Sequence, residues 1–442
     1  METSVSEVRQ VQRGAGPSAR FQIGPDDATR RMLWRWHGAF GDMYRVYGEH
    51  QNSPHWVVHD PDIVQQILVR NSANYSKGMG LDRVRILLGN GIMVSEGDFW
   101  ARQRRLIQPA FRPRTLADFN AMIVAENRRL ADRWQTAADG SQALEISAEI
   151  SEATLVIVLR SIFGADYDDL VDGGAHPFAL LTEQPERNLR FAARFHRLGQ
   201  VVERIIDTRR AEPRDDFDFL GYLLAARSKR GESMSRRALV DEVMTLIVAG
   251  HETTASALAW AWYLIATHPA VCERLQAGVD AIDPARLRVD GGHRNDALAY
   301  VDAVIKETLR LYPPGWLLSR RAIGPDSFGA HAIEPGTQVF ISPFVLHRHA
   351  DYWREPERFN PERFMSGPGR ARDPGHRFAY IPFSAGPRHC VGEHLAMVEM
   401  RIHLVEMLRR FTPRYAGRHP PQMESHINLR PKDGIYLQFL PR

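Results

Sequence analysis

The chain has few cysteines. Its 442 residues include two, Cys272 and Cys390, which lie in very different sequence contexts and offer no disulfide framework. Such scarcity is typical of proteins from the reducing cytoplasm, and it leaves no Cys-x-x-Cys pair of the kind that many zinc sites use. We therefore expect a cytoplasmic protein without structural disulfides.

A long uninterrupted hydrophobic run is also missing. The most apolar stretch, residues 244–266, is interrupted by polar residues and a glycine at 250–254. That pattern argues against a bilayer-spanning helix and favours a long buried one. Residues 1–20 are polar and charged, so we expect a flexible segment there, with no signal peptide, membrane anchor or membrane span.

No linker, low-complexity segment or internal repeat divides the rest of the chain. Residues 21–442 are therefore expected to form a single domain. A glycine-rich nucleotide fingerprint and a set of iron–sulfur cysteines are both missing, so we expect no fused reductase.

A strong excess of one charge is missing too. The chain has 57 Lys and Arg against 53 Asp and Glu, a net charge of +4. No basic stretch alternates with aromatic residues, so nucleic-acid binding is not expected. Arg102, Arg105, Arg112 and Arg114 form either a solvated basic face or a docking surface for an acidic redox protein.

Cys390, in contrast, lies in a segment suited to hold one thiolate. Gly386 and Gly392 permit tight backbone turns that direct N–H groups at a sulfur. Arg388 is a nearby cation, Phe383 offers a ring that shields the sulfur from water, and an apolar helical pattern follows. Because cations, N–H groups and helix N-termini stabilise a thiolate, the segment favours an iron ligand.

Three more segments combine charged or polar residues with helical patterns. Residues 249–254 place a glycine, an acid and two threonines inside the most apolar helix, which predicts a local kink and a proton relay. Glu307 and Arg310 share one helix face before the double proline 313–314. Trp100 and Arg104, four residues apart, also share a face, where a guanidinium can bind a carboxylate.

These segments together resemble the cytochrome P450 family. Residues 383–392 match every fixed position of its heme-binding signature, Phe-x-x-Gly-x-Arg-x-Cys-x-Gly, and residues 249–254 match its oxygen-activation motif. The motifs occur in the family's order, and the resemblance extends from about residue 40 to the end. It implies a mainly α fold with small β-sheets, shaped as a triangular helix-rich prism, and heme b held by the Cys390 thiolate.

The resemblance also implies roles for individual residues. Thr253 and Glu252 are expected to deliver protons for O2 activation, and Glu307, Arg310 and Arg363 to brace the segment before the cysteine loop. Residues expected to contact the heme, its iron or its propionates are Trp100, Arg104, Ala249, Gly250, Arg320, Phe383, Arg388, Cys390 and Gly392.

The expected reaction is insertion of one oxygen atom from O2 into a lipophilic small molecule, with electrons from a separate ferredoxin or flavodoxin. The motifs lean towards a fatty acid, terpenoid, carotenoid or other natural product. Expected substrate contacts are Leu87, Ile92, Val248, Ala249, Trp316, Leu317 and Ile427.

The residues leave three alternatives open. A peroxygenase would use hydrogen peroxide in place of O2, and a heme sensor or carrier would not need Thr253. A zinc hydrolase would use His389, Cys390 and His394, with His347 and His349 upstream, although no second cysteine lies nearby.

Helical periodicity dominates 115–165, 187–230, 236–268, 297–312 and 391–411. The best strand candidates are His55–His59, Thr337–Ile341 and Gly434–Phe439.

Overall fold

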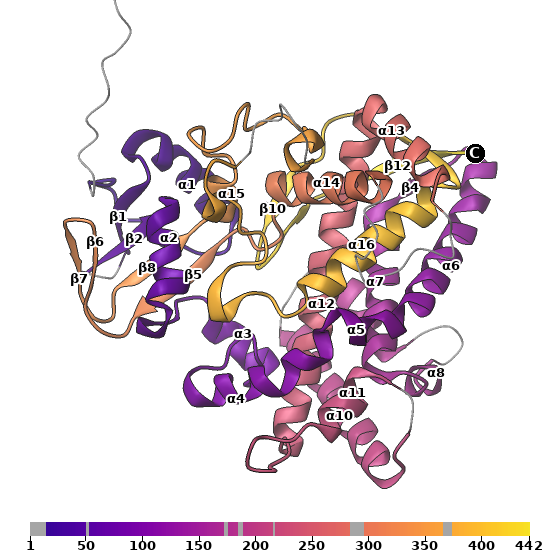
Figure 1. Ribbon diagram of the computed structural model, residues 1–442, viewed down its shortest axis with the longest axis horizontal. Coiled ribbons are helices and arrows are strands. Elements are labelled where there is room, and N and C mark those ends of the chain that lie inside the picture. The colour runs from indigo at the N-terminus through magenta and orange to yellow at the C-terminus, as the bar shows by residue number, and fades with distance from the viewer. Residues whose placement is uncertain are drawn as a thin grey trace, which may run out of the picture.

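Figure 1 shows a computed structural model of the chain, which describes residues 15–49, 53–171, 176–183, 189–214, 217–282, 296–365 and 374–442. Helices dominate, and the strands gather in small sheets, so the predicted fold class is confirmed. Most of the segment predicted to be flexible, residues 1–14 of 1–20, lies outside the described residues.

The longest described helix, α12 (Arg236–Thr267), organises the helical region. It begins after Ser235, whose side chain accepts a hydrogen bond from the Ala238 N–H. It packs against α7 (Ile146–Phe163), α10 (Leu189–Ala211), α14 (Asp296–Leu311) and α16 (Glu393–Leu408), as Figure 1 shows.

The polar interruption of α12 lies between two apolar cores. The first half of the helix, up to Ile247, packs into one core with α7 and α10. The second half, from Ala255, packs into another with α14 and α16. The helix continues through the segment that was predicted to kink. Within that segment the Thr253 and Thr254 hydroxyls donate to the carbonyls of Ala249 and Gly250, one turn earlier.

The remaining α-helices are α1 (Asp27–Phe40), α2 (Pro61–Gln65), α3 (Leu81–Leu88), α4 (Gly97–Ile107), α5 (Pro113–Leu116), α6 (Asn120–Asp139), α8 (Asp166–Asp169), α9 (Leu180–Glu183), α11 (Phe219–Ala225), α13 (Pro269–Asp280) and α15 (Pro343–Leu346). Of these, α6 and α11 lie within the segments predicted from helical periodicity, α5 overlaps one, and the others lie outside them.

The largest sheet has the order β1-β2-β8-β5-β3 and lies on the opposite side of Figure 1 from α6 and α13. Its strands are β1 (Met43–Tyr47), β2 (Pro54–Val58), β3 (Tyr75–Lys77), β5 (Leu318–Ala322) and β8 (Gln338–Ile341). The smaller sheets pair β6 (Asp326–Phe328) with β7 (His331–Ile333), β10 (Met423–Ser425) with β11 (Leu429–Pro431), and β12 (Tyr436–Pro441) with β4 (Ala143–Glu145) and β9 (Phe411–Tyr415).

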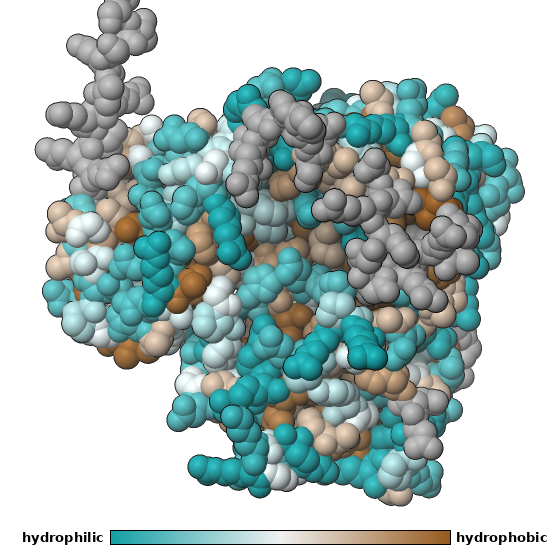
Figure 2. Space-filling model, in the orientation of Figure 1, coloured by the Kyte–Doolittle hydropathy of each residue, from teal (hydrophilic) through white to brown (hydrophobic). Residues whose placement is uncertain are grey.

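The face shown in Figure 2 is largely hydrophilic, with apolar side chains in small separate patches. Among the described residues, no helix combines the length and the apolar character that crossing a membrane requires.

The core of α16 contains a buried carboxyl group that predicts a pH effect. Burial raises the pKa of Glu399 to about 8, and its Oε1 has no hydrogen-bond partner within the described part of the chain. The folded protein therefore holds this proton more tightly than the unfolded chain, so stability falls as pH rises from the ordinary glutamate pKa through about 8.

Glu399→Gln removes this penalty. A pKa shift of one unit corresponds to about 1.4 kcal/mol of stability. At pH 9 the free energy of unfolding of the variant is therefore expected to exceed that of the wild type by up to a few kcal/mol, which is measured as a higher urea midpoint. At pH 5 the two proteins are expected to match. Glu273→Gln, at an exposed position on α13, is the control. A gain from Glu399→Gln that is the same at pH 5 and pH 9 would contradict the assignment.

Candidate active site

The cysteine segment is a tight loop held against the large-sheet side of the molecule. Gly386 has φ +70°, and a Cβ at this position would approach the Leu68 carbonyl oxygen to 1.8 Å. Any other residue would therefore push the loop away from the backbone at Leu68. The Cys390 N–H donates to the Phe383 carbonyl at 2.9 Å, which closes the loop just before α16 begins after Gly392.

The Cys390 sulfur is accessible although it lies deep in the protein. The residue is exposed by surface area, while burial is the largest effect on its thiol and raises the pKa. The backbone N–H groups of Gly392 and Glu393 and the charge of Arg104 lower the pKa, but the Glu393 carboxylate opposes them. The net pKa is raised, so the N–H groups and cations expected to favour a thiolate are insufficient alone, and a metal ion would complete the ionisation.

Four cations gather beside the cysteine loop. Lys77 on β3 lies opposite Arg320 on β5. Besides burial, the charges of Arg320 and Arg388 lower the pKa of Lys77, and the charge of Arg388 lowers the pKa of Arg320. Arg104 on α4 adds to this repulsion through Arg388, and the neighbouring carboxylate is Glu96. Burial and repulsion lower the pKa of Lys77 to about 7 and that of Arg320 to about 10. Such a cluster is suited to a ligand with two negative charges, such as the two propionates of a heme.

The structure gives Arg388 more partners than the sequence suggested. It pairs with Glu96, donates to the Ser95 carbonyl at 2.7 Å and lies over the Trp100 ring, with 3.8 Å from Cζ to the ring centroid. Arg388 and Trp100 thus hold each other beside the loop. Sequence reasoning missed Lys77, because only the β3–β5 register reveals that it lies next to Arg320.

The segment that matches the oxygen-activation motif lies in the middle of α12. The Thr253 hydroxyl donates to the Ala249 carbonyl at 2.8 Å, so its lone pairs are left to accept a hydrogen bond from a water. A Cβ at Gly250 would meet Val158 Cγ2 of α7 at 3.1 Å. The role of Gly250 in this structure is to let α7 approach α12.

Asn428, like Lys77, was not expected at the site from the sequence, and it contacts residue 252 of α12. Asn428 follows the exposed Ile427 in the turn between β10 and β11, and its side-chain Nδ2 donates to Glu252 Oε2 at 2.9 Å. Asn428 carries no sequence signal, since asparagine in a turn is ordinary and its contact with α12 spans 176 residues.

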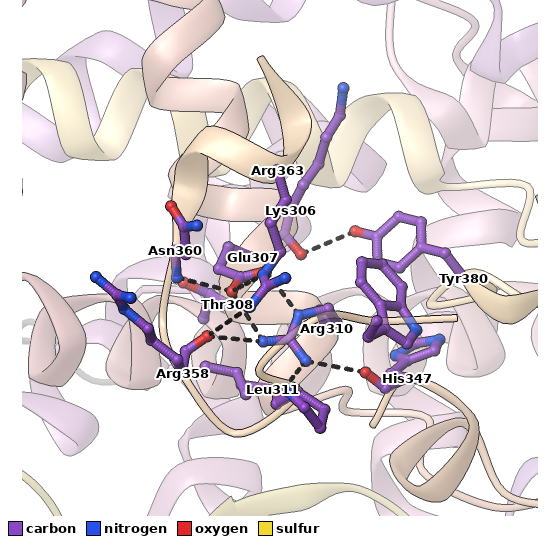
Figure 3. A network of polar contacts seen from close by, with 12 residues as sticks. Lys306, Glu307, Thr308, Arg310, Leu311, His347, Arg358, Asn360, Arg363 and Tyr380 are labelled. Atoms are coloured by element: carbon purple, nitrogen blue, oxygen red, sulfur yellow. Dashed lines mark hydrogen bonds and ion pairs between the residues drawn. The ribbon is translucent and has the colours of Figure 1, made fainter. Parts of the chain in front are cut away.

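The Glu307 carboxylate is the centre of a buried polar network, shown in Figure 3. It accepts hydrogen bonds from Arg310 Nε and Nη2 at 2.7 and 2.8 Å, from Arg363 Nε at 3.2 Å and from the Asn360 N–H at 2.8 Å. Arg310 in turn donates to the carbonyls of His347, Pro356 and Arg358. The network ties α14 to the segment that leads to the cysteine loop.

The expected substrate contacts are not all available to a ligand. Leu87, Ile92 and Val248 are partly buried beside the first apolar core, Leu317 is partly buried, and Ile427 is 45% exposed. Trp316, in contrast, is fully buried, with its Nε1 donating to the His426 carbonyl at 2.9 Å. It is a core residue in this structure, because its ring is covered by protein on all sides.

The histidines around the loop have other partners. His389 lies 3.1 Å from the Glu393 carboxylate, and the His347 Nε2 accepts from the Ile381 N–H at 2.9 Å. Neither geometry gathers ligands for zinc around Cys390.

Comparison with known proteins assigns this arrangement to a family. The sequence model of the family described as "Cytochrome P450" matches residues 19–180 and 175–439. The chain belongs to the cytochrome P450 family. This P450 is therefore a heme-thiolate oxidoreductase of the monooxygenase type, and the residues around the cysteine loop fit heme b.

Curated relatives of this P450 come from plants, bacteria and a mammal. It is 33% identical to cyclooctatin synthase of Streptomyces melanosporofaciens over 374 residues, 80% of this chain and 79% of the relative. It is 30% identical to the protein LUTEIN DEFICIENT 5 of Arabidopsis thaliana, over 87% of this chain and 70% of the relative. Carotene epsilon-monooxygenase of the same plant is 28% identical over 93% and 81% of the two chains.

Solved structures agree in fold. The crystal structure of the cytochrome P450 CYP102L1 has a TM-score of 0.83 and 27% identity, and covers 98% of this chain and 100% of that one. The cytochrome P450DA heme domain, 23% identical with a TM-score of 0.82, covers 97% and 98% and shows the fold alone.

Lys77→Met is expected to weaken heme binding about tenfold, because a charge-assisted hydrogen bond to a propionate is worth roughly 1.5–3 kcal/mol. The measurement is the rate of heme transfer to apomyoglobin. Arg321→Met is the control, since Arg321 neighbours Arg320 on β5 but is exposed. Equal transfer rates for Lys77→Met and the wild type would remove Lys77 from the site.

Proposed function

We propose that this P450 inserts one oxygen atom from O2 into a lipophilic natural product, with Cys390 as the ligand that would hold the heme iron. The proposal is supported by two features of one chain: a cysteine with exposed surface in the loop before α16, and an acid and a hydroxyl, Glu252 and Thr253, in the middle of α12. The acid and the hydroxyl supply the protons that O2 activation needs, whereas a carrier or sensor needs neither.

Bound heme supplies the redox centre at which O2 is activated. Cys390 presents its sulfur at the N-terminal end of α16, where two backbone N–H groups favour the thiolate. Lys77, Arg104, Arg320 and Arg388 would hold the propionates.

The Thr253 hydroxyl can accept a hydrogen bond from a water, because its own proton is donated to the Ala249 carbonyl. Glu252 passes a proton toward Thr253 through water and regains one from solvent, so the carboxyl group ends each cycle as it began.

The names of several relatives support a terpenoid or carotenoid substrate. They include cyclooctatin synthase, cyclooctat-9-en-7-ol 5-monooxygenase and carotene epsilon-monooxygenase. The partly buried apolar residues Leu87, Ile92, Val248 and Leu317, with the exposed Ile427, suit a substrate of this kind.

We propose that electrons come from a separate ferredoxin or flavodoxin in the cytoplasm. We also propose that residues 21–442 form a single domain. Arg105, Arg112 and Arg114 are exposed around the end of α4 and the turn that follows it. A basic patch on that side of the molecule favours an acidic partner.

The test is reconstitution with a reductase and a ferredoxin or flavodoxin under 18O2. Substrates are first screened for a shift of the ferric Soret band among terpenoids, carotenoids and fatty acids. One 18O atom in the product is the expected result. Product only with hydrogen peroxide would identify a peroxygenase, and ligand binding without any product would identify a sensor or carrier.

A further inference from the structure

The turn between β10 and β11 is fastened to one face of α12 by two side chains. Asn428 Nδ2 donates to Glu252 Oε2 at 2.9 Å, and the Ser256 hydroxyl donates to the Leu429 carbonyl. Glu252 and Ser256 are four residues apart, so they lie on the same face of the helix.

The other side of the turn is fastened to the segment after α14. The Leu429 N–H donates to the Pro314 carbonyl at 3.0 Å, and the Trp316 indole donates to the His426 carbonyl at 2.9 Å. Leu429 is fully buried while its neighbour Ile427 is 45% exposed. The turn therefore presents an expected substrate contact next to a residue that holds the acid of the proton relay.

The contact itself selects one protonation state of Glu252. An amide N–H can donate to either form, but it stabilises the ionised carboxylate more, because a hydrogen bond to a charged acceptor is the stronger one. On the hairpin, the charged neighbours are already paired: Arg430 Nε lies 2.8 Å from Glu424 Oε2 and His426 Nε2 lies 3.4 Å from Glu424 Oε1. On α12 itself the adjacent titratable group is the buried His251.

We propose that Asn428 is a positioning residue for proton delivery, whose amide holds Glu252 ionised against the β10–β11 turn until movement of that turn releases it. The inference rests on the proposed role of Glu252 as proton donor. It connects substrate binding to the proton relay, because a substrate that displaces Ile427 also displaces Asn428 and removes the hydrogen bond that favours the ionised carboxylate.

The experiment compares three variants at Asn428 with one control. Asn428→Leu removes the donor at nearly constant volume, Asn428→Asp replaces it with a like charge, and Asn428→Gln keeps the amide on a longer side chain. Ser256→Ala removes the other fastening of the turn and leaves the Asn428 amide in place.

The first measurement is an infrared titration of the substrate-free protein. The band of protonated Glu252 is identified by its loss in Glu252→Gln. Asn428→Leu is expected to move the titration midpoint of Glu252 up by about one pH unit, and Asn428→Asp further, because the ionised form loses a hydrogen bond or gains a repulsion. Asn428→Gln and Ser256→Ala are expected to stay within a few tenths of a unit of the wild type.

The second measurement is the pH dependence of product formed per electron pair consumed. In each variant, the midpoint of this pH dependence is expected to shift in the same direction and by the same amount as that variant's infrared midpoint of Glu252. An unchanged infrared midpoint in both Asn428→Leu and Asn428→Asp would overturn the inference, and so would an equal shift in Ser256→Ala, which would mean that Asn428 only holds the turn together.

Failure of the proposed monooxygenase function and failure of the Asn428 inference give different results. If the wild type forms no product with any donor while the infrared midpoint still shifts, the proposed monooxygenase function fails and the positioning of Glu252 stands. If the wild type forms product and the midpoint does not shift, the function stands and Asn428 has no such role.

Discussion

Glu307→Ala is expected to destabilise the protein by roughly 3–5 kcal/mol and to prevent stable incorporation of heme. The carboxylate accepts hydrogen bonds from two buried guanidinium groups and one backbone N–H. Its removal takes the carboxylate partner from Arg310, which has no exposed surface, and one carboxylate contact from Arg363. A buried cation without a partner costs far more than an exposed one, and the segment fixed by this network leads directly to the cysteine loop.

The measurement is the urea midpoint together with the heme content of purified protein. Arg358→Ala is the matched control, because Arg358 pairs with Glu355 at the same i,i+3 spacing but both side chains are 65% exposed. That pair is expected to contribute less than 1 kcal/mol. Equal losses of stability from Glu307→Ala and Arg358→Ala would mean that burial does not determine how strongly the Glu307 network stabilises the protein.

Thr253→Ala is expected to lower product formation by about 100-fold, the lower end of what general acid–base catalysis contributes, while consumption of electrons falls much less. The Thr253 hydroxyl is held in place by its hydrogen bond to the Ala249 carbonyl. An alanine at position 253 has no side-chain atom that could accept a hydrogen bond from a water of the proton relay. The surplus electrons are expected to appear as hydrogen peroxide.

The adjacent Thr254 provides the control. Its hydroxyl makes the same kind of bond, to the Gly250 carbonyl at 3.1 Å, but the residue is buried. Thr254→Ala is therefore expected to reduce stability slightly and to leave the ratio of product to peroxide near the wild-type value. Full product formation by Thr253→Ala would contradict the relay and favour a sensor or carrier.

The sequence was sufficient for the features that depend on local pattern. Helical periodicity located the ends of α12, α14 and α16 to within three residues, because long amphipathic or buried helices follow from composition and spacing alone. Cys390 and the Glu307–Arg310 spacing were visible because their chemistry lies within a few neighbouring residues.

Features that depend on long-range packing were not visible. Lys77 enters the cation cluster only through the register of β3 on β5, and Asn428 reaches Glu252 across 176 residues. Trp316 was expected to contact the substrate, but tertiary packing buries it. The close approach of Val158 on α7 to Gly250 on α12 also follows from tertiary packing and not from local sequence.

The central claim is that the Cys390 thiolate ligates the heme iron of a working monooxygenase. The most direct test is the absorption spectrum of the ferrous protein with carbon monoxide. The wild type is expected to show the red-shifted Soret band of a thiolate ligand, and Cys390→Ser to lose it while Cys272→Ser keeps it. A purified wild type without this band, or a band that survives Cys390→Ser, would contradict the account.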